Sequence, residues 1–233
     1  RQAFGTAIDR QAYVDGVLQG AGVPTTSWVP PGMPGYDKDL GTQYSFDPQK
    51  AQQLLAQAGF PDGKGLPKVT FIMVASDSNK IVGQFIQDQL KKNLGVDVDV
   101  QYLDSKAYGG SFGTGDYQVT IQSWSADWPY PDNWLPDQFG TGAGNNLVNF
   151  SNQQFDDLMA KAAAELDNQK RLDLYDQGQK LMLDQAPIMP LYNRVSYTLT
   201  KPNVKNLVIT GIDGAIKGDY NLWQTYIAAP GNK

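Results

Sequence analysis

The sequence contains no cysteine and no histidine among its 233 residues. These two absences exclude Ser-His-Asp and Cys-His catalysis, thiol redox chemistry and the usual zinc sites, because each of them needs one of these side chains. Carboxylates, lysines and tyrosines are left for acid-base work. We expect no metal and no cofactor. The chain is also long enough to bury a core without disulfides.

Basic clusters and long apolar runs are missing as well. The formal net charge is −5, and the 19 lysines and arginines are scattered, so no stripe could neutralise nucleic-acid phosphates. No apolar run approaches the about 20 residues that a membrane-spanning helix needs. Residues 1–20 already show helical apolar spacing and no leader pattern, which we interpret as a start inside a longer protein.

Strand and helix patterns alternate through the middle of the chain. The expected elements are strands at 69–75, 98–103 and 117–124, a helix at 79–94 with Ile81, Phe85, Ile86 and Leu90 on its apolar side, and a short helix after Asp104. Such alternation with short links favours an α/β fold with a mainly parallel central sheet flanked by helices.

The flanking parts show clear helix signals and many turns. Asp47 and Pro48 begin a helix that Gly59 ends, whereas residues 22–46 are rich in proline and glycine and have no period. Further expected elements are helices at 151–166, capped by Ser151, and at 169–183, a strand at 188–192, and a β-rich tail that includes 207–209 and 222–227.

The segment SWSADWPYPDNWL, residues 123–135, is the most informative part of the sequence. It holds three tryptophans, one tyrosine, two prolines and two aspartates directly after an expected buried strand. Ligands of α/β proteins bind beyond the carboxyl ends of the strands. Asp127 lies between Trp124 and Trp128, and a carboxylate among aromatic faces is poorly hydrated and gains from meeting a cation. The segment therefore predicts a ligand site.

Six motifs along the chain resemble one family, the peptide, dipeptide and nickel type of bacterial solute-binding proteins. They occur in the family's order and spacing, and together they cover essentially the whole chain. The motifs are RQAFGTAIDRQAYVDGVL, VPPGMPGY, FDPQKAQQLLAQAGF, WSADWPYPDNWL, FDDLMAKAAAELD and APIMPLYN.

The resemblance implies a periplasmic-binding-protein-like fold in which two lobes close over a ligand. Residues 1–195 would form the second, ligand-binding lobe, and residues 196–233 a small β-rich carboxyl-terminal segment that returns toward a first lobe preceding Arg1. The implied function is delivery of a peptide or similar small polar solute to the permease subunits of an ABC transporter. The implied place is outside the cytoplasm, with a lipid anchor at the absent amino terminus, and no enzymatic activity is expected.

The resemblance also implies site residues. Asp127 occupies the position that pairs with the amino terminus of the ligand in peptide-binding members. The residues just before it, Trp124, Ser125 and Ala126, would add backbone hydrogen bonds to an extended peptide. Further candidates for the pocket are Trp128, Tyr130, Tyr192 and Asn193.

Several alternatives remain open at this stage. Other members of the family bind oligosaccharides or nickel complexes, and Trp128 and Tyr130 would suit sugar stacking. A glycoside hydrolase would use Asp127 and Asp132, although both lie on one proline-rich loop and not on separate supports. Asp127 could also be a turn carboxylate and Trp124 a core residue. Arg194 could meet either a ligand carboxylate or a neighbouring acid.

Overall fold

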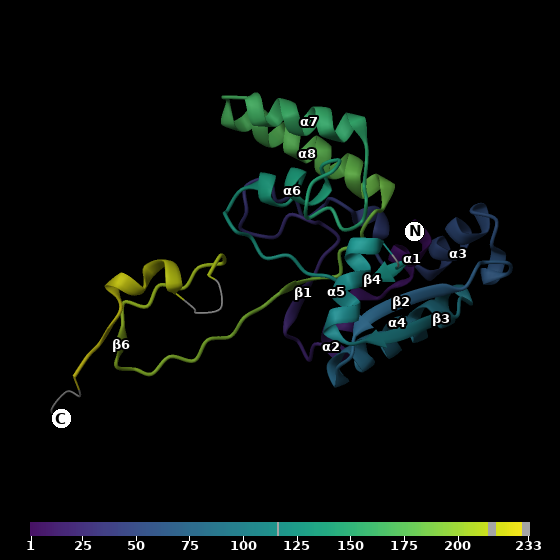
Figure 1. The fold of residues 1–233 in the computed structure, drawn as a ribbon, viewed down its shortest axis with the longest axis horizontal. Helices are drawn as coiled ribbons and strands as arrows, with labels where there is room; N and C mark the ends of the chain where they lie inside the picture. The colour runs from purple at the N-terminus through teal and green to yellow at the C-terminus, as the bar shows by residue number, and fades with distance from the viewer. Residues whose placement is uncertain (116, 214–217, 230–233) are drawn as a thin grey trace.

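A three-stranded parallel sheet forms the centre of the body (Figure 1). The computed structural model describes residues 1–115, 117–213 and 218–229. The strand order is β3-β2-β4, and α4 and α5 are the two crossovers. Because these crossovers run in opposite directions across the sheet and such connections are right-handed, α4 and α5 cover opposite faces. The predicted parallel sheet with flanking helices is confirmed. Its elements are β2 (Val69–Val74), α4 (Asp77–Leu94), β3 (Val98–Leu103), α5 (Ser105–Thr114) and β4 (Val119–Thr120).

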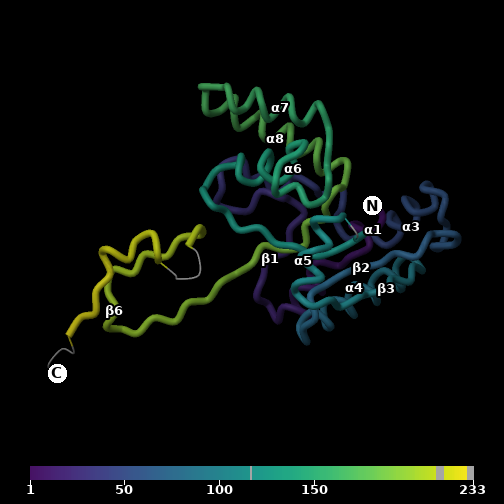
Figure 2. Tube along the Cα trace, viewed as in Figure 1, coloured from purple at the N-terminus to yellow at the C-terminus, as the bar shows by residue number. Residues whose placement is uncertain are grey.

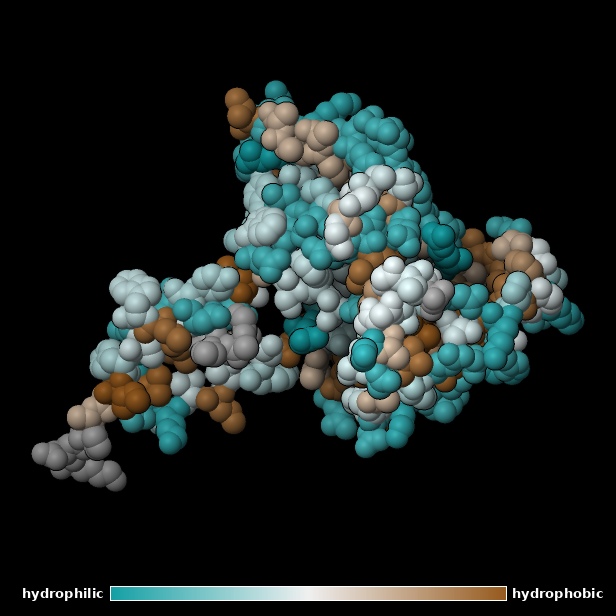
Figure 3. All heavy atoms as spheres, in the orientation of Figure 1, coloured by the Kyte–Doolittle hydropathy of each residue, from teal (hydrophilic) through white to brown (hydrophobic). Residues whose placement is uncertain are grey.

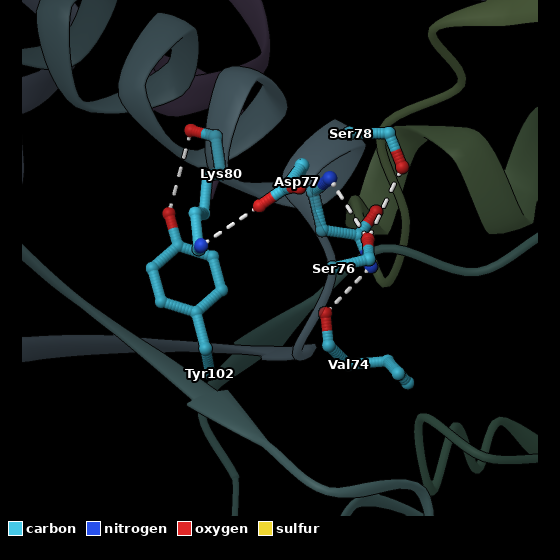
Figure 4. A network of polar contacts seen from close by, with 7 residues as sticks. Val74, Ser76, Asp77, Ser78, Lys80 and Tyr102 are labelled. Atoms are coloured by element: carbon cyan, nitrogen blue, oxygen red, sulfur yellow. Dashed lines mark hydrogen bonds and ion pairs between the residues drawn. The ribbon is translucent and has the colours of Figure 1, made fainter.

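The first turn of α4 shows how the sequence sets an element boundary (Figure 4). The Ser76 hydroxyl accepts a hydrogen bond from the backbone N–H of Asn79 at 3.1 Å, and the Asn79 side chain donates to the Val74 carbonyl at 2.7 Å. The cap ties the helix to the end of β2. At the other end Gly95 takes the left-handed conformation, with φ 70°, and closes the helix. The helix therefore begins two residues earlier than the apolar spacing indicates.

Two predicted details of the helices are wrong. Ile81 is 58% exposed, and Val82 is buried in its place. The other three residues of the predicted apolar side, Phe85, Ile86 and Leu90, pack in the core on the sheet as predicted. The helix α7 (Gln153–Ala164) is capped by Asn152, which accepts from the backbone N–H of Phe155 at 3.0 Å. Ser151 instead exchanges a hydroxyl hydrogen bond with Thr141.

Two predicted strands are also displaced. The strand expected at 117–124 is paired only at Val119–Thr120, since the chain then leaves the sheet to cross to the helical part of the body. The strand expected at 188–192 begins instead at Tyr192, as β5 (Tyr192–Arg194), and pairs antiparallel with β1 (Gly22–Pro24) outside the parallel sheet.

The body contains two hydrophobic cores. One lies on the sheet, where Phe71 and Met73 pack with α1 (Gln2–Ala7), α3 (Pro48–Gln57) and α4. The other lies beneath the hairpin of α7 and α8 (Asn168–Gln185), which confirms the predicted helix pair (Figure 2). The remaining elements of the body are α2 (Arg10–Gly16), η1 (Thr42–Tyr44), η2 (Pro61–Gly63), η3 (Pro131–Asn133) and α6 (Pro136–Phe139).

The carboxyl-terminal segment projects away from this body (Figures 1 and 2). Its described part holds β6 (Val204–Lys205) paired antiparallel with β7 (Tyr226–Ile227), and η4 (Asp219–Gln224). The tail is thus less rich in strands than predicted, because 207–209 forms none and 222–224 is helical. Apolar side chains lie open on it, among them Leu199 at 102%, Trp223 at 84% and Ile227 at 74% exposure (Figure 3). No helix in the described ranges combines the length and apolar character required to cross a bilayer.

Gly41 fixes the path of the segment that links β1 to α3. Its φ is 73°, and a Cβ atom there would overlap the carbonyl oxygen of Thr26. Gly32, in the same segment, has a φ of 88° but open space around the Cβ position. We expect Gly32→Ala to cost about 1 kcal/mol of unfolding free energy through backbone conformation alone. Gly41→Ala should cost about 2 kcal/mol more than its matched control, because the backbone must also move. Urea denaturation of both variants checks this, and equal losses would contradict it.

Candidate functional site

An open groove is lined by residues from both cores and from the segments that connect them, and also by residues 210–213 and 219–220 of the carboxyl-terminal segment. The chain reaches it directly after β4. Of the predicted site residues, six line this groove: Trp124, Ser125, Ala126, Asp127, Tyr192 and Asn193. The structure therefore brings together two parts of the sequence that lie more than sixty residues apart.

Asp127 lies on the wall of this groove with an exposed carboxylate. Its backbone N–H donates to Asn133 Oδ1 at 2.9 Å, and its Oδ2 accepts from Asn133 Nδ2 at 3.3 Å. One oxygen of the carboxylate is thus held by the protein, and the side chain remains accessible from the groove. No described lysine or arginine forms an ion pair with it. The carboxylate is free to receive a cation from outside the chain.

Asn133 organises the loop around Asp127. It is fully buried and accepts a further hydrogen bond from the Trp124 indole at 3.1 Å, while its amide also donates to Asp137 Oδ2 at 3.2 Å. The amide oxygen therefore fixes both the backbone at Asp127 and the Trp124 ring, and the amide nitrogen holds the carboxylates of Asp127 and Asp137. Local sequence patterns do not predict this role. The available signal was an amide six residues after the aspartate, inside an aromatic loop, since an amide side chain offers two donors together with an acceptor oxygen.

The backbone before Asp127 runs between the two cores without a partner strand. Ile121 packs against the sheet core, whereas Ala126 and Trp134 are buried in the helical core. Within the part of the chain that the structure describes, residues 123–126 form no backbone hydrogen bond with any other backbone group. Their N–H and C=O groups line a groove unpaired, and such a row of groups can pair with an added strand.

Tyr192 and Asn193 enter the groove from β5. Their register with β1 pairs Tyr192 with Pro24 and Asn193 with Val23. The Tyr192 ring packs at 5.6 Å from the ring of Tyr13, so one side of it belongs to the sheet core. Both residues are partly exposed, and they line the groove together with the segment that precedes Asp127.

Trp128 and Tyr130 do not line this groove. The Trp128 indole donates to Asp132 Oδ1 at 2.6 Å, and its ring is 43% exposed. The Tyr130 hydroxyl accepts from Arg171 Nε at 2.7 Å, and Tyr130, Asp132 and Arg171 line a separate small hollow beside α7 and α8. The hydrogen bond to the Tyr130 hydroxyl raises the pKa of the Arg171 guanidinium above its usual value. The shift therefore comes from a contact inside this hollow.

The positions of Asp127 and Asp132 argue against the glycoside hydrolase alternative. Asp127 faces the groove, whereas Asp132 lines the separate hollow and bonds to the backbone N–H of Asn133 at 3.0 Å. A glycosidase needs its two carboxyl groups on either side of one scissile bond. These two aspartates do not face a common space. Among the described residues there is also no cluster of three or more acidic side chains that could hold a metal ion.

Comparison with known proteins places this geometry in a family. Residues 1–146 match the model of the bacterial extracellular solute-binding proteins, family 5 Middle. The oligopeptide-binding protein OppA of Bacillus subtilis (strain 168) is 29% identical over 91% of the chain and 40% of its own length. Heme-binding protein A of Haemophilus influenzae is 32% identical over 89% of the chain and 38% of its own length.

A solved structure supports the same assignment. The periplasmic binding protein DppA from Helicobacter pylori, in complex with the peptide STSA, superposes with a TM-score of 0.78 at 26% identity. The superposition covers 98% of this chain and 43% of that one. The chain spans about two fifths of the length of the curated relatives it matches. With its family match, its parallel sheet and its groove, the chain belongs to family 5 of the bacterial extracellular solute-binding proteins.

Proposed function

We propose that this chain is the ligand-gripping second lobe of a two-lobe protein that captures peptides for an ABC importer. The observation that carries the proposal is the meeting of two features in one groove. An accessible carboxylate at Asp127 continues a run of unpaired backbone at residues 123–126. A peptide offers the matching features in the same order, an ammonium group followed by alternating amide donors and acceptors.

In this proposal each group in the groove contacts a different part of the peptide. Asp127 binds the peptide ammonium, and the backbone of 124–126 pairs with the peptide by strand addition. Trp124, held by Asn133, offers part of its ring to the first side chain. Tyr192 and Asn193 form the opposite wall. The relatives named for oligopeptide and for peptide complexes support this class of ligand.

The carboxyl-terminal segment supports the two-lobe arrangement. Residues 1–195 would form the gripping lobe, and 196–233 the connection to a first lobe. The large apolar side chains of Leu199, Trp223 and Ile227 are exposed on this segment, and exposed apolar surface of this kind is typical of an interaction site. A first lobe would cover it. Ligand contact with both lobes would stabilise the closed form, which is the form recognised by the permease.

Two further features of the full-length protein are its location and its chemical activity. The family description places its members outside the cell, and we propose a periplasmic or cell-surface location with a lipid anchor at the amino terminus of the full-length protein. We propose binding without turnover. The groove carries the accessible carboxylate of Asp127, but the other aspartate of residues 123–135, which we call the signature loop, does not line it.

Calorimetric titration of the full-length protein tests the proposed function. The ligands are tetra-alanine, a cello-oligosaccharide, a nickel-histidine complex and haem, the last because one relative is named for it. We expect tetra-alanine to bind with a dissociation constant of micromolar order, near −8 kcal/mol, and the other three to give no heat of binding. The 233-residue chain alone should bind weakly, because half of the contacts are absent. Binding of a non-peptide ligand in preference to every peptide would contradict the proposal.

A further inference from the structure

Arg194 is a charged residue that lines the groove, and no part of the proposed function uses it. It is the last residue of β5, opposite Gly22 of β1, and its side chain is exposed. Its Nη2 donates to the Ser123 hydroxyl at 3.2 Å, and this is its one hydrogen bond among the described residues. A guanidinium has five N–H donors, so most of them remain available.

No described residue forms an ion pair with this guanidinium through a carboxylate. All ion pairs among the described residues are formed by lysines, and none involves Arg194. Three described acids line the groove: Asp213 is engaged by Thr210 and Gly218, Asp127 by Asn133, and Asp219 by the backbone N–H of Tyr220. Arg194 was expected either to pair with a neighbouring acid or to meet a ligand, and the structure shows no described acid in the first role.

Ser123 connects the position of Arg194 to that of Asp127. Ser123 and Asp127 lie four residues apart in the signature loop, so their Cα atoms are at most about 14 Å from each other. A cation and an anion thus stand at the two ends of the unpaired backbone run. A peptide strand of about four residues covers the same span at about 3.3 Å per residue. Its ammonium at one end and a carboxylate at the other would meet opposite charges.

We propose that Arg194 is a specificity-determining residue that receives a carboxylate of the bound peptide about four residues from its amino terminus. This inference rests on the proposed peptide-binding function. The planar guanidinium suits a carboxylate because two parallel N–H···O bonds can form at once. The hydrogen bond from Arg194 to Ser123 turns the guanidinium toward the unpaired segment and leaves its other edge for the ligand.

Peptides with and without the carboxylate test the inference in the full-length protein. Tetra-alanine is titrated against its carboxyl-terminal amide, with the unaltered protein and with Arg194→Gln, Arg194→Lys and Lys92→Gln. Lys92 is an exposed residue of α4 outside the groove, so its variant is matched in charge change. The unaltered protein and Lys92→Gln should bind the acid about five- to tenfold more tightly than the amide, since the guanidinium is partly hydrated. Arg194→Gln should bind both equally, and Arg194→Lys should keep part of the preference.

A second pair of ligands identifies the source of the carboxylate. Amidated hexa-alanine is compared with the same peptide carrying glutamate at its fourth residue. A preference for the glutamate peptide that Arg194→Gln abolishes shows that an internal acidic side chain is accepted as well as a carboxyl terminus. An unchanged acid-to-amide ratio in Arg194→Gln would overturn the inference while peptide binding stands. Failure of the unaltered protein to bind any peptide would overturn the proposed function, and the inference with it.

Discussion

Replacing Arg10 with methionine is expected to lower the unfolding free energy of the chain by about 3 kcal/mol, because four buried carbonyl oxygens lose their donor. Arg10 is only 6% exposed. Its guanidinium donates to the carbonyls of Pro190 and Tyr44 at 2.8 Å each, and also to those of Gly5 and Ile8. One side chain thus joins α1, the linking segment before α3 and the strand that enters the groove.

Two opposing effects decide the size of this loss. Burial lowers the pKa of Arg10 to about 10, so the charged form carries a desolvation penalty that methionine would remove. At pH 7 the side chain is still charged, since the pH lies well below that value. Methionine keeps much of the apolar packing but leaves the carbonyls without partners in a space that excludes water. We expect the unpaired carbonyls to outweigh the relief of the charge.

Arg171→Met provides the matched control in urea denaturation. Arg171 also bonds to a carbonyl and to the Tyr130 hydroxyl, but it is partly exposed on the hairpin of α7 and α8. Its loss should cost less than about 1 kcal/mol, because water can reach the groups that it leaves. If Arg10→Met proves as stable as the unaltered chain, the burial penalty outweighs the carbonyl bonds and Arg10 does not hold the three segments together.

Asn133→Asp is expected to be the most damaging single change at the site, although it replaces one amide nitrogen by oxygen. That nitrogen donates to Asp127 Oδ2 at 3.3 Å and Asp137 Oδ2 at 3.2 Å. A carboxylate in its place would face two others in a buried position, so we expect a loss of about 3 kcal/mol at pH 7. The oxygen that accepts from Asp127 and Trp124 is retained, and the change therefore isolates the donor side.

The pH dependence of this variant follows from the same geometry. The two neighbouring acids raise the pKa of the introduced carboxyl in the folded chain above its unfolded value. A raised acid pKa favours the folded state at low pH and destabilises it as the pH rises through that value. The deficit should therefore shrink as the pH falls from 7 toward 4.

Asn152→Asp is the control for the same chemical change. Asn152 caps α7 by accepting from Phe155, and aspartate caps a helix equally well. Urea denaturation should show little loss for this variant at any pH. An equal loss in Asn133→Asp and Asn152→Asp, or a deficit in Asn133→Asp that does not change with pH, would contradict the role assigned to the Asn133 amide.

The sequence predicted the fold where local signals decide the structure. The caps at Asp47 and Asp104 lie where the pattern indicated, because a helix cap acts within one helical turn. Predictions failed where tertiary contacts decide. Residues 121–124 look like a strand, but they leave the sheet because the next residues are buried in the second core.

At the site, too, features set by local sequence could be predicted, and those set by tertiary contacts could not. The signature loop and Asp127 could be predicted from composition and from position after a strand. The partners of Trp128 and Tyr130 could not, because Asp132 and Arg171 reach them through the folding of the loop onto α8. Arg194 meets Ser123 across 71 residues of sequence, a pairing that no local pattern contains. Asn133 was overlooked for the same reason, since its role depends on burial.

The most direct test of the central claim is calorimetric titration of the full-length protein and its Asp127→Asn variant with tetra-alanine and with N-acetyl-tetra-alanine. Asp157→Asn, an exposed carboxylate on α7, serves as the control. We expect Asp127→Asn to weaken the free-amino peptide by about 10- to 100-fold, as for a hydrogen bond between charged groups, and the acetylated peptide less than about twofold. Equal losses for the two peptides would show that Asp127 does not bind the ammonium group of the ligand.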